Sequence, residues 1–572
     1  MLYTLNMEYI EIDLSEGTFN RLPSGEKTGL SLALDLYDRY PEDDVIIFAA
    51  PSSKALDNAG SSVFSILYNS PITGEKAFAY SNFPFGYSMY KLDMSALVIK
   101  GCVHRLSYIS LYSGNFDIIS CEHLKGVSSA EFEKEARSIT DSVLSTGRAA
   151  DNGVKYATLQ FQGKAINGAG LGYLFHLKGL KGIIAPGYSV TEGASVSKDA
   201  FRRVRKIEKS QFARRVRKQG ACCFVEDALR LGWIPVRGYS DRFDPRAYSL
   251  SAASFAELYG NYPDSCSDCF LACGRRKKDS SALPGWVDVM MLGSNLGIFS
   301  PEKVIRLTET ALKEGLDSAH LGALLSYALS LDEKERDIIG LRDLNVDNLQ
   351  KLIVLIGENR GAGAVFESGL GAFPDAIKSA KGEAIFADLR GAYSQAIAAS
   401  MSLNLFLPSG LVLPKYPVSA ECAAILAFYE IIYILALLEY GYRPFSAVAL
   451  YWSNLPELAF HVPQLMRFYC RRFSIYGHKM KDLLPKGLEI FERLGLGFDD
   501  IPEHFRMDPE SASDNRTVPM LKLQEFFLSE KLKAEIISKS IREKSSKPSS
   551  ESKAADAPSD ERGLDADPGL TR

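Results

Sequence analysis

Apolar and polar residues alternate in short runs along the first part of the chain, roughly to residue 190, as they do in half-buried β-strands. The runs are separated by glycine, proline, asparagine and serine. They predict strands at Tyr9–Leu14, Val45–Ala50, Ser61–Leu67, Ala96–Lys100, Leu106–Tyr112 and Gly182–Ala185. One helix is expected here, at Ser128–Leu144, because two serines open it and Glu131 follows them.

From about Ser197 the period changes to that of amphipathic helices. Ser300 and Pro301 are typical of a helix start, with serine at the N-cap and proline at the first helical position. The predicted helices are Lys198–Gln219, Cys222–Leu231, Ser254–Tyr259, Pro301–Glu314, Ser318–Ser330, Val346–Asn359, Pro374–Ala380, Glu421–Glu439, Leu458–Phe473 and Lys486–Leu494. The end of the chain is rich in Ser, Lys, Asp, Glu and Pro and is predicted to be disordered.

Composition narrows the class of protein. The 572 residues favour several domains, and the hydrophobic share of 46% is ordinary for a globular protein. A net charge of −4 argues against nucleic-acid binding, and the basic cluster at Arg202–Arg217 is interpreted as a solvated helix face.

One segment is apolar enough to be checked as a membrane span. Ala423–Leu438 carries Glu430 and is short for such a span, so a buried core helix is expected. No signal peptide is recognised, which predicts a cytoplasmic protein that does not bind membranes.

Three cysteines lie close together in the run Cys266-Ser-Asp-Cys269-Phe-Leu-Ala-Cys273. Thiolates are the ligands that iron–sulfur clusters and zinc select, and the following Arg and Lys residues would offset a negative cluster. A [4Fe–4S] centre is the first interpretation. A zinc site or a group of core thiols is the alternative, and the chain offers no second CxxC half for zinc. The fourth ligand is left open between Cys422, Cys470 and none.

A glycine-rich loop holds Gly168, Gly170 and Gly172. Bare backbone lets a chain approach an anionic group closely, but a lone pattern of this kind is as often a structural bend. It does not match a Walker A loop.

Several motifs now fall into one order. They are Tyr9–Gly17, Val45–Pro51, Ser70–Gly74, Phe85-Gly86 with Ala96–Gly101, the glycine loop to Ile183, Cys266–Arg275, Leu292–Ile298 and Glu314–Asp317. This series resembles the tungsten-dependent aldehyde:ferredoxin oxidoreductase family from the N-terminus to about residue 530. The resemblance implies an α+β fold. A β-rich N-terminal domain (1–195) is followed by a helical domain with the cysteine motif (196–385), a C-terminal helical domain (386–535) and the disordered tail (536–572).

The resemblance also implies a function. A tungsten or molybdenum ion on two pterins, together with the [4Fe–4S] cluster, would oxidise an aldehyde to a carboxylic acid and pass electrons to ferredoxin, with the cofactor supplying the chemistry. It leaves a homodimer open. The alternative is a divergent, non-catalytic relative that keeps the fold and a cluster as an electron-transfer or scaffold subunit.

The chain departs from the family at several expected contacts. Leu312 and Leu438 replace the acids of the two pterin motifs, and Arg443 replaces the fourth cluster cysteine. A glutamate expected before Leu292 reads Val287 or Gly285. Catalytic residues are therefore not assigned. Pterin contacts would pass to Asn82, Asn167, Gly168, Gly170, Gly172, Asp317 and Arg390.

Overall fold

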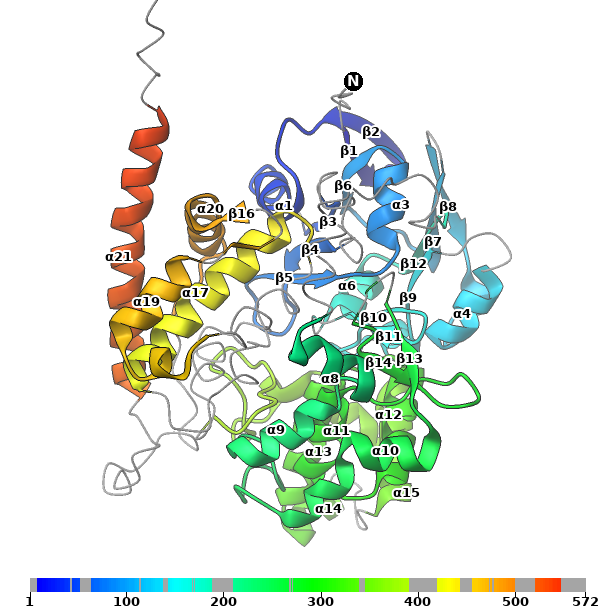
Figure 1. Cartoon of the computed structure of the whole chain (residues 1–572). Coiled ribbons are helices and arrows are strands. Elements are labelled where there is room, and N and C mark those ends of the chain that lie inside the picture. The colour runs from blue at the N-terminus through cyan, green and yellow to red at the C-terminus, as the bar shows by residue number, and fades with distance from the viewer. Residues whose placement is uncertain are drawn as a thin grey trace, which may run out of the picture.

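A computed structural model describes most of the chain, with a β-rich part and a helical part (Figure 1). The described residues are 8–41, 44–51, 63–112, 115–136, 142–166, 168, 170–187, 209–266, 269, 271–338, 345–389, 419–442, 455–472, 474–475, 478–498 and 520–546.

The first sheet has six strands in the order β2-β1-β6-β3-β4-β5. They are β1 (Glu8–Asp13), β2 (Thr18–Pro23), β3 (Ile46–Ala49), β4 (Phe64–Asn69), β5 (Lys76–Ser81) and β6 (Met94–Lys100). β1 and β6 run parallel, with Ile12 opposite Ile99, and the other neighbours are antiparallel. The central strands β3 and β6 are almost fully buried, which explains their continuous apolar sequences.

The second sheet also has six strands, in the order β11-β10-β9-β12-β7-β8. They are β7 (Ser107–Tyr112), β8 (Asn115–Ser120), β9 (Ser142–Thr146), β10 (Leu159–Phe161), β11 (Lys164–Ala165) and β12 (Leu180–Ala185). One core joins the two sheets, since Ile12 and Phe48 of the first pack in the same cluster as Ile109 and Ile183 of the second. Two short helices, α3 (Phe85–Lys91) and α6 (Leu171–Leu177), contribute to this core.

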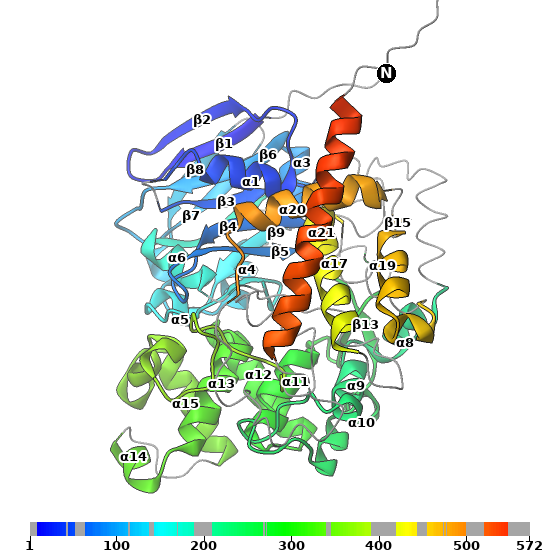
Figure 2. The same cartoon turned by 90° about the vertical axis from the view of Figure 1, so that its left-hand side faces the viewer.

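The other face of the first sheet is covered by α1 (Gly29–Tyr37) and by helices from the end of the chain (Figure 2). These are α17 (Ala420–Glu439), α19 (Pro463–Arg471), α20 (Met480–Arg493) and α21 (Met520–Ser546). The Glu439 carboxylate accepts a 2.7 Å hydrogen bond from the Ser31 backbone N–H, which joins α17 to α1. Among the described helices, α17 alone is long and apolar enough to cross a membrane, yet 94% of this stretch is buried inside the protein. This confirms a buried core helix.

The helical part in the middle of the chain is built on two further cores. Its helices are α8 (Gln211–Gln219), α9 (Cys223–Leu231), α10 (Ala252–Tyr259), α11 (Trp286–Met291), α12 (Pro301–Glu314), α13 (Ser318–Ser330), α14 (Glu333–Ile338) and α15 (Val346–Gly357). The predicted bounds of α12 and α13 are correct to the residue.

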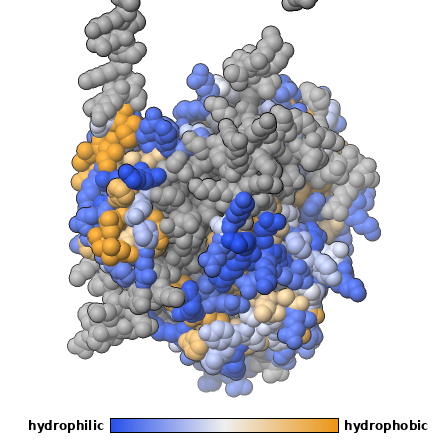
Figure 3. All heavy atoms as spheres, in the orientation of Figure 1, coloured by the Kyte–Doolittle hydropathy of each residue, from blue (hydrophilic) through white to orange (hydrophobic). Residues whose placement is uncertain are grey.

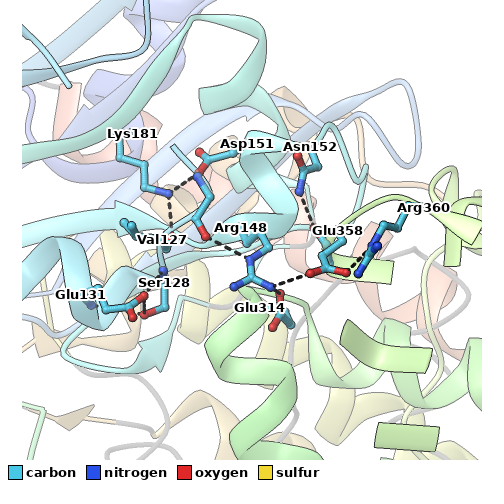
Figure 4. A network of polar contacts seen from close by, with 12 residues as sticks. Val127, Ser128, Glu131, Arg148, Asp151, Asn152, Lys181, Glu314, Glu358 and Arg360 are labelled. Atoms are coloured by element: carbon cyan, nitrogen blue, oxygen red, sulfur yellow. Dashed lines mark hydrogen bonds and ion pairs between the residues drawn. The ribbon is translucent and has the colours of Figure 1, made fainter. Parts of the chain in front are cut away.

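A polar network ties the second sheet to these helices (Figure 4). Lys181 of β12 lies 2.5 Å from the Asp151 carboxylate, and both side chains are almost fully buried. Asp151 belongs to α5 (Arg148–Asp151), whose Arg148 pairs with Glu314 of α12 at 3.5 Å and with Glu358 at 3.2 Å. Lys181, Asp151, Arg148, Glu314 and Glu358 each have an opposite charge beside them.

Four expectations about elements need correction. The helix expected at Ser128–Leu144 ends early: α4 spans Ser129–Ala136, and Ser142 begins β9, which pairs with both β10 and β12. Residues 374–380 form turns rather than a helix, and the helix expected from residue 198 is described only from Gln211. The tail is helical over its first residues, because α21 continues to Ser546. The other predicted domain boundaries stay predictions.

Candidate metal centre and active site

The three clustered cysteines lie on the loop of a small hairpin. β13 (Tyr262–Asp264) pairs with β14 (Gly274–Arg276), so that Asp264 faces Gly274 and both ends of the loop are fixed. Within the loop Cys269 is buried, and Cys266 and Cys273 are half-buried. The Ser265 hydroxyl donates a 2.8 Å hydrogen bond to the Cys269 carbonyl. The hairpin therefore brings the three thiols into one short segment.

Arg275 fastens this loop to the C-terminal end of α8. Its guanidinium donates to the backbone carbonyls of Val216, Arg217, Ala272 and Gly274 and to the Asn261 side-chain oxygen, at 2.5 to 3.0 Å. The Val216 carbonyl also accepts the Gly220 N–H at 2.7 Å, whereas the Arg217 carbonyl lies in the last turn, where a helix leaves carbonyls without an internal partner. The Arg275 side chain therefore connects the end of α8 to the segments on both sides of the cysteine loop.

The charge of Arg275 has no counter-charge within the described part of the chain. Only 7% of the residue is exposed, and each of the oxygens it contacts belongs to a neutral group. Burial lowers the pKa of Arg275, and the nearby thiols of Cys273, Cys222 and Cys223 act in the opposite direction. A buried cation without an anion is costly. Its position beside thiols indicates a place for an anionic group.

The nearest further cysteine belongs to the turn before α9. The Ala221 N–H donates to the Cys273 carbonyl at 2.8 Å, and Cys222 packs against the same hydrophobic cluster as Cys266, Cys269 and Cys273. By contrast, Cys422 and Cys470 are buried in the core formed by α17 and α19. The structure thus does not place either of these two in the cluster that the cysteine loop packs against.

Donor chemistry at this loop fits an iron–sulfur cluster, because it carries three cysteines and because the thiols of Cys273, Cys222 and Cys223 lie near the buried Arg275. Yet among the described residues no three His, Cys, Asp or Glu side chains are already close enough together to hold a metal ion. Ligation would therefore require the cysteine side chains to converge, and their role as ligands stays a prediction.

Asn82 connects the first sheet with the cysteine loop. It follows β5, is buried, and its Nδ2 lies 3.6 Å from Cys266 Sγ. Lys164 of β11 makes a second connection, because its ammonium group lies 2.8 Å from the Asp264 carboxylate. The loop therefore lies where both sheets meet the helical part.

The glycine loop leads into α6, a helix that the sequence analysis missed. Gly170 is its N-cap with a φ of +89°, a conformation that L side chains rarely adopt. A Cβ on Gly170 would lie 2.4 Å from Pro71, and one on Gly172 would lie 2.7 Å from the Thr158 carbonyl. The small size of these two residues serves packing within the protein. Their contact with a pterin stays a prediction.

Behind this loop lies a group of three acids, Asp288, Asp317 and Glu383. Each keeps some accessible surface, yet burial is the main cause that raises its pKa, to about 6 for Asp317 and about 8 for Glu383. Asp288 further raises the pKa of Asp317, and Asp317 raises that of Glu383. These carboxyl groups lie inside the fold without being sealed by protein atoms.

Helix starts hold two of the acids in place. Asp317 caps α13 and accepts from the His320 N–H at 2.8 Å. Asp288 lies in the first turn of α11 and accepts from the Gly285 N–H at 2.8 Å and from the Ser318 side chain. No hydrogen bond from the described residues reaches the Glu383 carboxyl group, whereas its backbone N–H donates to the Ser379 hydroxyl at 2.9 Å.

Two buried tyrosines, Tyr68 and Tyr156, lie close to these acids, and the buried His320 follows Asp317 in α13. Tyr68 of β4 is 2% exposed, its pKa is raised by burial and by Glu383 and Asp317, and its hydroxyl lies 2.8 Å from where a Cβ on Gly168 would be. The Tyr156 hydroxyl and His320 Nδ1 have no hydrogen-bond partner among the described residues. Unsatisfied buried polar groups are rare. This set of donors and acceptors fits a polar heterocycle such as a pterin.

His320 is held as a neutral ring. Its Nε2 accepts a 2.9 Å hydrogen bond from the Leu370 N–H, and the ring stacks on Tyr156 with centroids 4.9 Å apart. Burial lowers the pKa of His320 to about 3. Because Nε2 accepts, Nδ1 carries the proton and can donate to a bound group.

The structure describes some of the predicted site residues and not others. Asn82, Gly168 and Asp317 lie around the cysteine loop and the acids, whereas Asn167 and Arg390 are outside the described residues. Sequence reasoning missed Asp288, which directly follows the position where a glutamate was expected, and Glu383, for which the sequence offers no signal.

Comparison with known proteins follows this geometry. The model of the aldehyde ferredoxin oxidoreductase N-terminal domain matches residues 5–187, and that of domains 2 and 3 matches residues 196–408. The tungsten-containing aldehyde ferredoxin oxidoreductase of Pyrococcus furiosus is 27% identical over 307 residues, which is 51% of this chain and 51% of that protein. The chain therefore aligns with about half the length of this curated relative.

Two other relatives differ in name. The aliphatic sulfonate oxidoreductase WOR-like subunit of Pyrococcus furiosus is 32% identical over 107 residues, or 18% of this chain and 17% of that one. The solved active site complex BamBC of benzoyl coenzyme A reductase, with 1,5-dienoyl-CoA, is 15% identical. It covers 93% of this chain and 99% of its own with a TM-score of 0.61, which shows a shared fold. The predicted resemblance and the α+β fold class are confirmed.

Proposed function

The chain belongs to the aldehyde ferredoxin oxidoreductase family, and from this premise we propose that it is a cytoplasmic oxidoreductase that converts an aldehyde to a carboxylic acid and passes the electrons to ferredoxin. The proposed cofactors are a [4Fe–4S] cluster and a tungsten or molybdenum bis-pterin. The family assignment supports oxidoreductase chemistry, and the site geometry supports the finer steps.

The observation that carries the proposal is the charge environment of Arg275. Among the described residues, the oxygens around this buried guanidinium are all neutral, and it lies next to cysteine thiols. A thiolate-bound iron–sulfur cluster is anionic and would supply the missing charge. Zinc bound by three thiolates would also carry negative charge, so metal analysis has to separate the two.

We assign Cys266, Cys269 and Cys273 as three cluster ligands and Cys222 as the fourth. Cys222 shares the hydrophobic cluster of the other three, and its neighbour Ala221 is hydrogen-bonded to Cys273. Burial raises the pKa of the Cys222 thiol, so it would be protonated in the absence of a metal. Metal binding would release that proton.

The acids supply proton acceptors for the reaction. One aldehyde and one water give a carboxylic acid, two protons and two electrons, and the metallopterin would supply the two-electron chemistry. Asp317, with a pKa of about 6, is mostly ionised at neutral pH and can accept a proton. Glu383, with a pKa of about 8, is mostly protonated and can donate one. Two neighbouring acids with separated pKa values suit proton transfer in both directions.

The pterin would be bound by groups from both sheets and from α13. Asp317 lies near Tyr156 and His320, whose side chains each keep an unsatisfied polar atom, while Gly168 lies near the Tyr68 hydroxyl and Asn82 lies near Cys266. Asn167, Gly170, Gly172 and Arg390 complete the proposed set. Amide, carboxyl and ring N–H groups match the donors and acceptors of a pterin edge.

Metal and cofactor content tests the proposal. The protein is purified without oxygen, and iron, sulfide, tungsten, molybdenum, zinc and pterin are measured per chain together with aldehyde-dependent reduction of methyl viologen. Iron with tungsten or molybdenum, pterin and activity supports an enzyme. Iron without pterin overturns the catalytic proposal, and zinc alone overturns the cluster as well. Cys269→Ser should abolish the iron–sulfur absorbance, whereas the matched core variant Cys422→Ser should keep it.

A second function is a non-catalytic electron-transfer or scaffold subunit. It is favoured by the region of the first expected pterin acid, where Leu312 contributes a backbone carbonyl to Gln160 at 2.9 Å and Glu314 pairs with Arg148. The neighbouring acid thus belongs to the structural network of Figure 4. The same metal analysis separates this function from the enzyme.

A further inference from the structure

One face of α8 is basic and lies beside the cysteine loop. Arg214, Arg217 and Lys218 are exposed on it, and Lys278 is exposed just after the hairpin. A shallow cleft along α8 is lined by Gln211, Arg214, Arg215, Lys218 and Gln219. Figure 3 shows strongly hydrophilic side chains gathered over this part of the surface. We call Arg214, Arg217 and Lys218 the basic face.

The cations next to the basic face have structural partners. Arg215 pairs with Asp227 at 2.8 Å, Arg276 with Asp264 at 2.9 Å, and Lys277 with Glu309 at 2.7 Å. The three side chains of the basic face form no ion pair with any carboxylate in the described ranges. Like charges gathered without partners repel one another, so folding does not explain their arrangement. The chain as a whole is acidic, with a net charge of −4.

Hydrogen bonds connect the backbone of this face to the cysteine loop. Arg275 donates to the Arg217 carbonyl at 2.5 Å and also to Ala272 within the cysteine loop. Asn261 donates to the Lys218 carbonyl at 2.6 Å and accepts from Arg275 at 2.5 Å. The backbone that carries the basic side chains is therefore fixed to the loop that carries Cys273. A partner seated on α8 would be held at a constant position relative to this loop.

We propose that the basic face docks an acidic electron-carrier protein and brings its redox centre to the cysteine loop. This inference rests on the proposed function, since it assumes that electrons leave through a cluster at that loop. Each docking transfers one electron to the carrier, which is reduced, and two dockings take up the two electrons of one aldehyde. Charge complementarity of this kind speeds encounter and weakens with salt, as fits a partner that must leave after each transfer.

Charge reversal tests the proposal. The variant Arg214→Glu/Lys218→Glu is compared with Lys334→Glu/Lys351→Glu, which changes charge equally on exposed positions of α14 and α15. The probe is a purified acidic [4Fe–4S] ferredoxin. We expect the α8 variant to raise the KM for ferredoxin and its Kd about tenfold at low salt, with unchanged viologen turnover and iron content. The α14–α15 variant should behave like the wild type.

Three outcomes overturn the proposal. One is an equal ferredoxin Kd for both variants, and another is a wild-type Kd that does not rise with salt. The third is loss of duplex-DNA or anionic-vesicle binding in the α8 variant while ferredoxin binding is unchanged. Failure of the proposed function is seen separately, as absence of iron or of aldehyde-dependent viologen reduction. The Kd measurement needs neither, so docking is judged on its own.

Discussion

Two buried cations in this protein have opposite surroundings. Lys181 lies 2.5 Å from Asp151 and also donates to the Val127 carbonyl at 3.0 Å (Figure 4). Arg275 is almost as deeply buried, but its partners are backbone carbonyls and one amide oxygen, with no described carboxylate. The chain cancels the first charge by itself and leaves the second uncancelled. A charge neutralised within the fold indicates structure, whereas a charge left over beside thiols indicates a bound anion.

The same contrast between paired and unpaired buried charges is found among the acidic residues. Asp288, Asp317 and Glu383 have no ion-pair partner among the described residues, whereas Glu314 and Glu358 in the network lie 3.5 Å and 3.2 Å from Arg148, although burial raises the pKa of Glu314 too. Unpaired interior acids cost stability and are retained at sites that handle protons or ligands.

Breaking the closed network should have the largest effect on stability. Lys181→Met leaves the Asp151 carboxylate buried without its cation, and we expect a loss of about 3–5 kcal/mol in the free energy of unfolding. Urea denaturation measures it. The double variant Lys181→Met/Asp151→Asn should recover much of the loss, because the carboxamide oxygen can still accept from the Gly126 N–H. A single variant that is no less stable than the double would contradict the idea of a closed pair.

Substitution of Glu383 should change how the free energy of unfolding depends on pH. The folded protein keeps this proton up to a pKa of about 8, whereas the unfolded chain releases it near the ordinary value of 4.5. The folded state therefore binds more protons between these values, and stability falls as pH rises, by up to about 1.4 kcal/mol per pH unit.

Denaturation curves from pH 5 to pH 9 measure this slope. Glu383→Gln should flatten it and be more stable than the wild type at pH 9, with little difference at pH 5. Glu333→Gln on the exposed surface of α14 serves as the control and should keep the wild-type slope. Equal slopes in all three proteins would place Glu383 in an ordinary solvated environment.

The smallest expected effect is a shift in the reduction potential of the cluster when Arg275 is substituted. Arg275→Gln removes a positive charge beside the thiols and should make the reduction potential more negative, because the reduced cluster carries more negative charge. Arg275→Lys keeps the charge and should leave the potential nearer the wild-type value, although the fork of hydrogen bonds is lost. A redox titration followed by electron paramagnetic resonance measures both. If the two variants shift the potential equally, charge is not the cause.

Local sequence patterns predicted those helices whose ends are set by residues next to them in the sequence. α12 and α13 are correct to the residue, since a serine–proline start and a glycine after Glu314 fix the ends of α12. The helix expected to Leu144 failed because Ser142–Thr146 joins the middle of the second sheet, and strand pairing overrode the helical period. α1 was missed because nearly all its residues are buried, which hides the amphipathic pattern.

The sequence by itself determined the β-rich start, the helical middle, the buried nature of α17 and the chemistry available at Cys266, Cys269 and Cys273. Only the tertiary structure decided what surrounds those thiols. It placed Cys222 in the cluster they pack against and Cys422 in another core, gave Arg275 no counter-ion from the described residues, and gathered Asp288, Asp317 and Glu383 from separate segments. Spacing along a chain specifies which groups a loop can present. Charge balance and desolvation depend on neighbours brought together by folding.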